Sequence, residues 1–152
     1  ETNFLGIERL LGRIRKLDRK TSRRGLMNVA IVRVEAAYGI QYMLPPASVQ
    51  AYHIYFPDPW PKRKHWKNRL IEPDFLPLLA KSLSTEGKVY LRTYNTDYFE
   101  QMEETFAGDS AFERIDAPDT LTQIVTDFEK TFNAKGIPTL RAQYRLRESV
   151  SK

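Results

Sequence analysis

Apolar residues along the chain follow two spacings, and together these predict strands that alternate with helices. Runs rich in β-branched and aromatic residues, with side chains alternating between two faces, are typical of strands. The predicted strands are Asn3–Glu8, Asn28–Glu35, Tyr52–Phe56, Lys88–Thr93, Phe112–Ile115 and Thr139–Leu146.

Between these strands, apolar residues recur at helical spacing and predict five helices. Their apolar positions are Leu10, Leu11, Ile14 and Leu17; Ala37–Leu44; Phe75, Leu76, Leu79 and Leu83; Phe99, Met102 and Phe106; and Leu121, Ile124, Phe128 and Phe132. Gly87 is expected just past the third helix, and Gly136 just past the fifth. Thr96 or Asp97 is expected to cap the fourth.

The alternation of strands and helices predicts the α/β class with a mostly parallel sheet. The chain has 152 residues, which is the size of one domain, so we expect a single domain over 1–152. No internal repeat, low-complexity tract or linker interrupts the pattern.

Composition excludes several classes of function. The chain has no cysteine, so disulfides and thiolate metal sites are excluded, and a reducing cytoplasm is the expected location. Two histidines, His53 and His65, are too few for a convincing metal cluster, and we expect no metal. No apolar run is long enough for a membrane helix, so no membrane partner is expected.

Charge is divided unevenly along the chain. Residues 1–69 contain 14 Lys/Arg and 5 Asp/Glu, a net charge of +9, whereas residues 70–152 contain 10 and 14, a net charge of −4. Such asymmetry indicates that a polyanion docks on one face of the molecule.

The most informative stretch follows the central strand. Pro57, Pro59 and Pro61 end the strand, because proline fixes φ and cannot donate to a ladder. Asp58 lies between the first two prolines, at the strand end where ligands bind in open α/β sheets. The loop that follows is rich in cations and flat rings, namely Trp60, Lys62, Arg63, Lys64, His65, Trp66, Lys67 and Arg69. This combination predicts a nucleic-acid site, although basic runs are also common as solvated surface.

Two further strands end on an acid, at Glu8 and Glu35. In dinucleotide-binding sheets, an acid at this place accepts hydrogen bonds from ribose hydroxyls, although an isolated acid there is more commonly a helix cap. Together with Asp58, these acids favour an adenosine-bearing cofactor. The glycine-rich turn of such sites, Gly-x-Gly-x-x-Gly, does not occur in the sequence, and we expect it upstream of Glu1.

Three motifs resemble the tRNA (guanine-N7-)-methyltransferase family. They are Phe4-Leu-Gly-Ile-Glu8, Phe56-Pro-Asp-Pro-Trp-Pro-Lys-Arg-Lys-His-Trp-Lys-Asn-Arg-Leu70, and Thr126-Asp-Phe-Glu-Lys-Thr-Phe132 with Gly136-Ile-Pro138 and Arg141. The resemblance implies a Rossmann-like class I methyltransferase fold with an antiparallel last strand, in a chain that lacks the first strand and the glycine-rich loop. It also implies methyl transfer from S-adenosylmethionine to the N7 atom of a guanosine in the tRNA variable loop, by a monomer or homodimer.

The resemblance also implies roles for particular residues. Glu8 is expected to bind the cofactor ribose, Glu35 to lie near its adenine, and Asp58 to be the central residue between cofactor and guanine. The expected substrate-binding residues are Lys62, Tyr94, Thr126, Asp127, Phe128 and Glu129, and the expected phosphate contacts are Arg63, Lys64, Lys67 and Arg69. The family has an aspartate where Tyr94 stands, so either Tyr94 or Asp97 would take its place or this substrate contact is absent; Phe128 replaces a tyrosine.

Two other interpretations are compatible with the sequence. Without the cofactor loop, the chain could be a non-catalytic RNA-binding module derived from a methyltransferase fold. Methyltransferases that act on amino groups of DNA or protein also place an acid and prolines after the fourth strand. The continuation Trp60-Pro-Lys-Arg-Lys-His65 argues against this second alternative.

Overall fold

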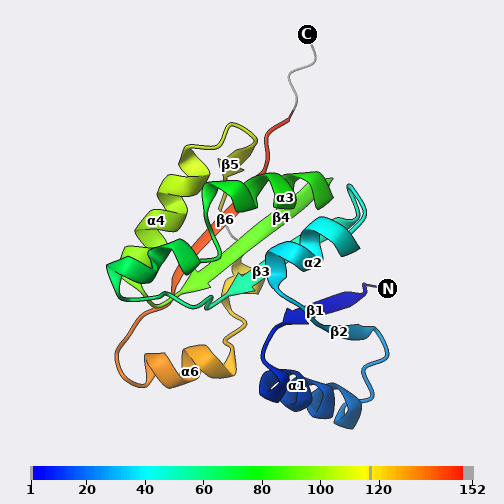
Figure 1. The fold of residues 1–152 in the computed structure, drawn as a ribbon. Helices are drawn as coiled ribbons and strands as arrows, with labels where there is room; N and C mark the ends of the chain where they lie inside the picture. The colour runs from blue at the N-terminus through cyan, green and yellow to red at the C-terminus, as the bar shows by residue number, and fades with distance from the viewer. Residues whose placement is uncertain (1, 117, 149–152) are drawn as a thin grey trace. The chain divides into compact units, whose positions relative to one another are not determined.

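A computed structural model describes residues 2–116 and 118–148, and these form two compact units, divided between Leu44 and Pro45 (Figure 1). Each unit combines strands with helices, so the predicted α/β class is confirmed. Among the described residues, no helix reaches the length and apolar character that crossing a membrane requires.

The first unit is a small β-α-β-α arrangement. Strands β1 (Phe4–Glu8) and β2 (Val29–Arg33) pair in parallel, and helix α1 (Leu11–Arg23) connects them. Helix α2 (Ala36–Met43) follows directly. A Cβ added to Gly6 would lie 3.3 Å from Leu17 Cδ2, so the glycine lets this side chain approach β1 closely.

The apolar face predicted for the first helix is present, but it is not buried. Leu10 is 49% exposed, Leu11 39% and Leu17 37%. Helix α1 therefore has the expected amphipathic pattern and contacts β1 and β2, but none of its residues is fully buried.

The second unit contains a four-stranded sheet in the order β3-β4-β6-β5. Its strands are β3 (Val49–Tyr55), β4 (Leu83–Thr93), β5 (Phe112–Arg114) and β6 (Leu140–Leu146). Strands β3 and β4 are parallel, whereas β6 is antiparallel to both β4 and β5, as expected for the last strand. The parallel pair places the ends of β3 and β4 at the same edge.

Two helices supply the core of the second unit. Helices α3 (Leu76–Ser82) and α4 (Thr96–Ala107) lie over the sheet in Figure 1. Their inward residues and those of the sheet are almost completely buried, including Leu76, Leu79, Val89, Leu91, Met102 and Phe106. Burial of this apolar area is the main stabilising contribution in the unit.

Three sequence predictions about these helices were wrong in detail. Leu83 begins β4 rather than ending the preceding helix, so Gly87 lies inside the strand. A Cβ at this position would overlap Leu83 Cδ2 and would lie 3.0 Å from the carbonyl oxygen of Val49. Helix α4 is capped by Asn95, which accepts from the Tyr98 N–H, rather than by Thr96 or Asp97. Tyr98, not Phe99, is the buried ring in its first turn.

The helix predicted through Leu121–Phe132 is divided into two. Helix α5 (Asp119–Thr122) and helix α6 (Asp127–Asn133) are separated because Thr126 caps α6. The Thr126 hydroxyl accepts from the Glu129 N–H, and the Glu129 carboxylate accepts from the Thr126 N–H. This capping box satisfies two backbone groups at the start of a helix, which overrides the continuous apolar spacing.

Candidate functional site

The first unit contains two acids at one edge of a parallel pair of strands. Glu8 is the last residue of β1, and its Oε1 accepts from the N–H groups of Arg9 (2.7 Å) and Leu10 (2.8 Å). Its other oxygen, Oε2, lies 3.4 Å from Arg13 Nη1, and the side chain is 26% exposed. One carboxylate oxygen thus orients the group, while the second is held by a long contact only.

Glu35 follows β2 and caps helix α2. Its Oε1 accepts from the Ala37 N–H (3.0 Å) and its Oε2 from the Tyr38 N–H (2.8 Å). Both oxygens therefore contribute to the helix start, where negative charge is also favoured by the helix dipole. The common alternative for such an acid, a helix cap, is what the structure contains here.

Glu8 and Glu35 differ in their capacity to accept hydrogen bonds from a ribose. A ribose presents adjacent hydroxyl donors, and a carboxylate oxygen can accept two hydrogen bonds. Glu8 fits this requirement, because Oε2 keeps accepting capacity at the carboxyl end of β1. Glu35 fits less directly, since each of its oxygens already accepts a backbone N–H.

In the second unit, Asp58 lies just beyond the carboxyl end of β3 and is exposed. Its Oδ1 accepts from the Trp60 N–H at 3.2 Å. Phe56 and Trp60, which flank the aspartate, have left-handed φ values of 54° and 44°. Residues other than glycine rarely adopt this backbone conformation, so the turn is locally strained. Asp58 is thus presented to solvent on a turn whose shape is closely determined.

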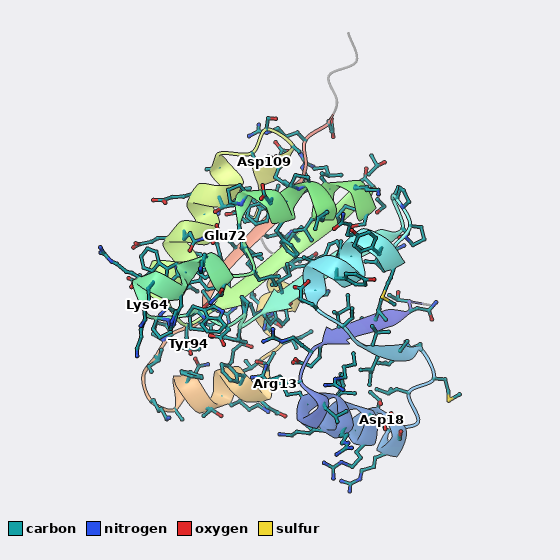
Figure 2. The ribbon with its side chains drawn as sticks, in the orientation of Figure 1. Arg13, Asp18, Lys64, Glu72, Tyr94 and Asp109 are labelled. Carbon is teal, nitrogen blue, oxygen red and sulfur yellow. The ribbon has the colours of Figure 1, made fainter. Side chains whose placement is uncertain are left out.

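The basic loop, residues 61–69, contains a short 3-10 helix, η1 (Arg63–Asn68). Lys62, Arg63, Lys64 and Lys67 are exposed, and the loop can be followed from the labelled Lys64 in Figure 2. Exposed cations close to Asp58 are compatible with the predicted phosphate contacts, which remain a prediction.

Arg69 lies in a different environment from the other cations. It is 4% exposed, and its Nε donates to the Pro59 carbonyl at 2.8 Å. Its guanidinium also lies over the rings of Trp66 and Tyr98, at 4.3 Å and 4.7 Å from their centroids. Burial lowers the pKa of Arg69, and the nearby Tyr98 opposes this shift. The contacts give Arg69 an internal role as a support for the turn that holds Asp58.

Four aromatic rings gather where β3 and β4 end. Tyr94, labelled in Figure 2, stacks on Phe132 with ring centroids 4.1 Å apart. Phe128 lies 4.7 Å from Phe56 and 4.8 Å from Phe132, and it remains 44% exposed. Tyr94 therefore belongs to an aromatic cluster. Asp97 lies in the first turn of α4 and is exposed.

The segment Thr126–Glu129 divides into an outer and an inner part. Asp127 is exposed and lies 3.8 Å from Lys130 Nζ, and Phe128 is the exposed ring described above. Glu129 is completely buried. Thr126 and Glu129 form the capping box of α6, so these two residues have a structural explanation that the sequence resemblance did not supply.

Glu129 is held between two arginines. Its Oε2 accepts from Arg92 Nη1 at 2.8 Å, and its Oε1 from Arg141 Nη2 at 2.7 Å. Burial raises the pKa of the Glu129 carboxyl, but hydrogen bonds from Thr126 and the charge of Arg92 outweigh it, and the net pKa is lowered. The carboxylate is therefore ionised across the neutral pH range.

Sequence reasoning missed Arg92. It lies one residue before the end of β4, where the sequence indicates an ordinary strand residue, and its partners are more than 25 residues away. The signal that could have found it is a charged residue at a position where strand neighbours are apolar. Within the described part of the chain, no group of three His, Cys, Asp or Glu residues is placed to hold a metal ion.

The sequence matches known methyltransferases. A sequence model of the family described as "Putative methyltransferase" matches residues 1–142. The tRNA (guanine-N(7)-)-methyltransferase of Halorhodospira halophila is 37% identical over 132 residues, which are 84% of this chain and 57% of that protein. The protein of the same name from Bordetella pertussis is 37% identical over 107 residues, 70% of this chain and 42% of that protein. The chain therefore spans about half the length of these curated relatives.

Solved structures share the fold. An rRNA methylase from Streptococcus thermophilus has a TM-score of 0.60 at 14% identity, covering 96% of this chain and 74% of that chain. A tRNA (m1A58) methyltransferase from Aquifex aeolicus has a TM-score of 0.60 at 13% identity, covering 97% and 54%. These similarities show a Rossmann-like, class I methyltransferase fold. Together with the match of the family model, they show that the chain belongs to the methyltransferase family that includes the tRNA (guanine-N7-)-methyltransferases.

Proposed function

We propose that this chain forms part of an enzyme that transfers a methyl group from S-adenosylmethionine to the N7 atom of a guanosine in the tRNA variable loop. The observation that carries the proposal is Asp58, an exposed carboxylate on a strained turn at the carboxyl end of β3, directly followed by the exposed cations of the basic loop. The names of the curated relatives support the same activity. We place the enzyme in the cytoplasm, as a monomer or homodimer.

The cofactor, when bound, supplies a methyl group on a positively charged sulfonium. Glu8 would accept hydrogen bonds from its ribose through Oε2, since Oε1 is already oriented by the backbone of Arg9 and Leu10. Glu35 would lie near the adenine while it caps α2. Both are acids that an adenosine group commonly meets at strand ends.

The reaction mainly requires the protein to place the reacting atoms correctly. Guanine N7 carries an in-plane lone pair and no proton, so the protein does not need a general base at this atom. Holding nitrogen, carbon and sulfur in line at near-attack distance can contribute several kcal/mol. Asp58 would orient the guanine by accepting hydrogen bonds from its Watson–Crick edge, or would steady the cationic donor.

The remaining residues would bind RNA. Lys62, with Arg63, Lys64 and Lys67, would neutralise phosphates. Tyr94 and Phe128 would offer ring faces on which a base can stack, and Asp127 would contact the nucleotide from the exposed start of α6. In this proposal Thr126 and Glu129 do not contact RNA but hold the start of α6 in shape through their capping box. Arg69 likewise contributes by supporting the Asp58 turn at the Pro59 carbonyl.

A direct assay tests the proposal. This chain, and a chimera that places the residues preceding the matched region of the Halorhodospira relative before Glu1, are incubated with tRNA and labelled S-adenosylmethionine. Digestion and mass analysis of the nucleosides identify the product. We expect 7-methylguanosine from at least the chimera. Methylation of another nucleoside, or methylation of DNA or protein amino groups in place of tRNA, would contradict the proposal.

The second candidate is a non-catalytic RNA-binding module, and the basic loop is the observation that favours it. Titration calorimetry with S-adenosylhomocysteine separates the two candidates. Binding to the chain or the chimera supports an enzyme. If both proteins bind tRNA but neither binds the cofactor product or methylates, the chain is a binding module.

A further inference from the structure

Arg92 is the most enclosed cation at the end of the second unit's sheet. It is 3% exposed, it pairs in register with Tyr55 of β3 and Arg141 of β6, and its guanidinium lies 4.4 Å from the centroid of the Tyr55 ring. Removing a guanidinium from water is costly unless its donors are satisfied. The partners of Arg92 therefore explain why a charge is tolerated at this position.

Besides the Tyr55 ring, three acceptors of the Arg92 side chain lie in one segment, residues 121–129. Arg92 Nη2 donates to the Leu121 carbonyl at 2.8 Å, and Nη1 donates to the Ile124 carbonyl and to Glu129 Oε2, each at 2.8 Å. The planar fork of an arginine suits such a set of acceptors in fixed directions, whereas a lysine ammonium is a single point of charge. Arg92 thus holds the backbone that precedes α6, at Leu121 and Ile124, and also the first turn of α6, through Glu129.

The main chain of Arg92 holds a second segment. Its carbonyl oxygen accepts from the N–H of Phe56 at 2.7 Å. Phe56 is the left-handed residue that opens the turn with Asp58. One residue therefore connects the Asp58 turn, through its backbone, with residues 121–129, through its side chain.

Stability alone does not account for this arrangement. Buried ion pairs are often no more stabilising than apolar residues of the same volume. The held segment also exposes Ile124 (60%), Val125 (42%) and Phe128 (44%), which are the exposed large hydrophobic residues among the described part of 45–152. A buried charge network thus keeps in place a segment that leaves apolar side chains in water, which is the opposite of what packing favours.

We propose that Arg92 is a positioning residue, which holds residues 121–129 at a fixed place relative to Asp58 so that one RNA base contacts both. The proposal rests on the proposed function. Arg92 does not touch the substrate itself. Its effect reaches the base through the exposed Phe128 on one side and through the Asp58 turn on the other.

The test compares Arg92→Lys with Arg141→Lys, in the chimera and in this chain. Both variants keep a positive charge beside Glu129, so the carboxylate is not left unpaired. Arg141 is a matched control, because it also bonds Glu129 but its guanidinium otherwise reaches the Thr139 carbonyl rather than those of Leu121 and Ile124. Melting temperature, amide hydrogen exchange, the single-turnover methylation rate and KM for tRNA are measured.

For Arg92→Lys we expect faster exchange in both 121–129 and 56–60, a methylation rate about tenfold lower per folded molecule, and KM within about threefold. For Arg141→Lys we expect the rate within about threefold and unchanged exchange at 121–124. The deficit of Arg92→Lys should persist on cooling, because it does not come from unfolding. If this variant does not fold, the neutral pair Arg92→Gln with Glu129→Gln replaces it.

An Arg92→Lys rate within about threefold of the starting protein, or unaltered exchange in 121–129, would overturn the proposal. The proposal is also overturned if the Arg92→Lys methylation rate equals that of the starting protein once it is divided by the folded fraction of the variant. When neither the chain nor the chimera methylates tRNA, the proposed function fails separately, and the exchange comparison still decides whether Arg92 connects the two segments.

Discussion

Asp58 is positioned by its own turn. Trp60 donates to it, Arg69 supports the Pro59 carbonyl behind it, and the Arg92 carbonyl anchors Phe56 before it. None of these contacts neutralises the carboxylate, which remains exposed and able to accept hydrogen bonds. At this scale the site is one acid whose direction is set by backbone geometry.

Replacing Asp58 with Ala should lower the methylation rate about 100-fold, because an orienting contact to the reacting base or donor is lost. Affinity for tRNA should stay within about threefold, since most binding free energy comes from phosphates. Single-turnover rates and filter binding in the chimera measure the two quantities. Asp74→Ala, at an exposed acid of η2 (Pro73–Phe75), is the matched control. Near-normal turnover of Asp58→Ala would remove this residue from the mechanism.

The basic loop and the first turn of α6 act as elements, through charge and shape. The loop presents exposed cations on a short 3-10 helix, whereas α6 begins with a capping box whose acid is buried between arginines. The two elements should therefore respond to different variables, the loop to salt and α6 to pH.

Changing Lys62, Arg63, Lys64 and Lys67 together to Ala should weaken tRNA binding and reduce its salt dependence. Each phosphate contact contributes roughly 0.7–0.9 units to the slope of log affinity against log salt, so losing four contacts should lower the slope by roughly 3–4 units. Binding titrations at several salt concentrations measure it. The single change Lys81→Ala, at an exposed cation of α3, should leave the slope unaltered. If the quadruple variant keeps the original slope, these four residues are solvated surface cations that do not contact phosphates.

Acid should loosen α6 through Glu129. Its pKa is lowered in the folded state from the ordinary value of 4.5, so the unfolded chain takes up the proton first. The stabilisation is complete above pH 4.5 and is lost as the pH falls through the folded value. Urea unfolding at fixed ionic strength should show the free-energy difference between wild type and Glu129→Gln shrinking over this range, by about 1.4 kcal/mol for each pH unit that separates the folded and unfolded pKa. Glu100→Gln serves as the control. A pH-independent difference would contradict this role.

Local patterns were sufficient to predict most elements, whereas the contacts that position the site come from distant residues. The strand before Pro57 and the acids at strand ends follow from alternation and from proline. The buried positions of Glu129 and Arg69 could not be predicted, because each depends on partners far along the chain. The break before α6 was missed because Thr126 makes a reciprocal cap within a continuous apolar spacing.

At the scale of the whole molecule, the apolar core is divided unequally between the two units. Of the buried hydrophobic residues, Ile40 is in residues 1–44 and the others are in residues 45–152. The first unit instead exposes large apolar side chains at the start of α1 and on α2, including Leu10, Leu11, Tyr38 and Tyr42. Most of the stabilisation from apolar burial should therefore belong to the second unit.

A fragment of residues 45–152 should unfold cooperatively, with a melting temperature within about 5 °C of that of the whole chain. Calorimetry and far-UV circular dichroism measure this. As a control, Leu79→Ala in the fragment should lower stability by about 2–5 kcal/mol, since Leu79 is fully buried. Non-cooperative melting of the fragment would show that residues 1–44 contribute to the core.

The two left-handed residues around Asp58 restrict how this turn can change over time. Glycine at Phe56 or Trp60 would relieve a local cost of about 1–2 kcal/mol, but it would remove a ring that contacts Phe128 or His65. Most non-aromatic side chains would keep the cost and lose the ring as well. Substitution of Phe56 or Trp60 is therefore unfavourable both for glycine and for larger non-aromatic residues. A protein engineer who seeks a more stable variant should leave this turn unchanged.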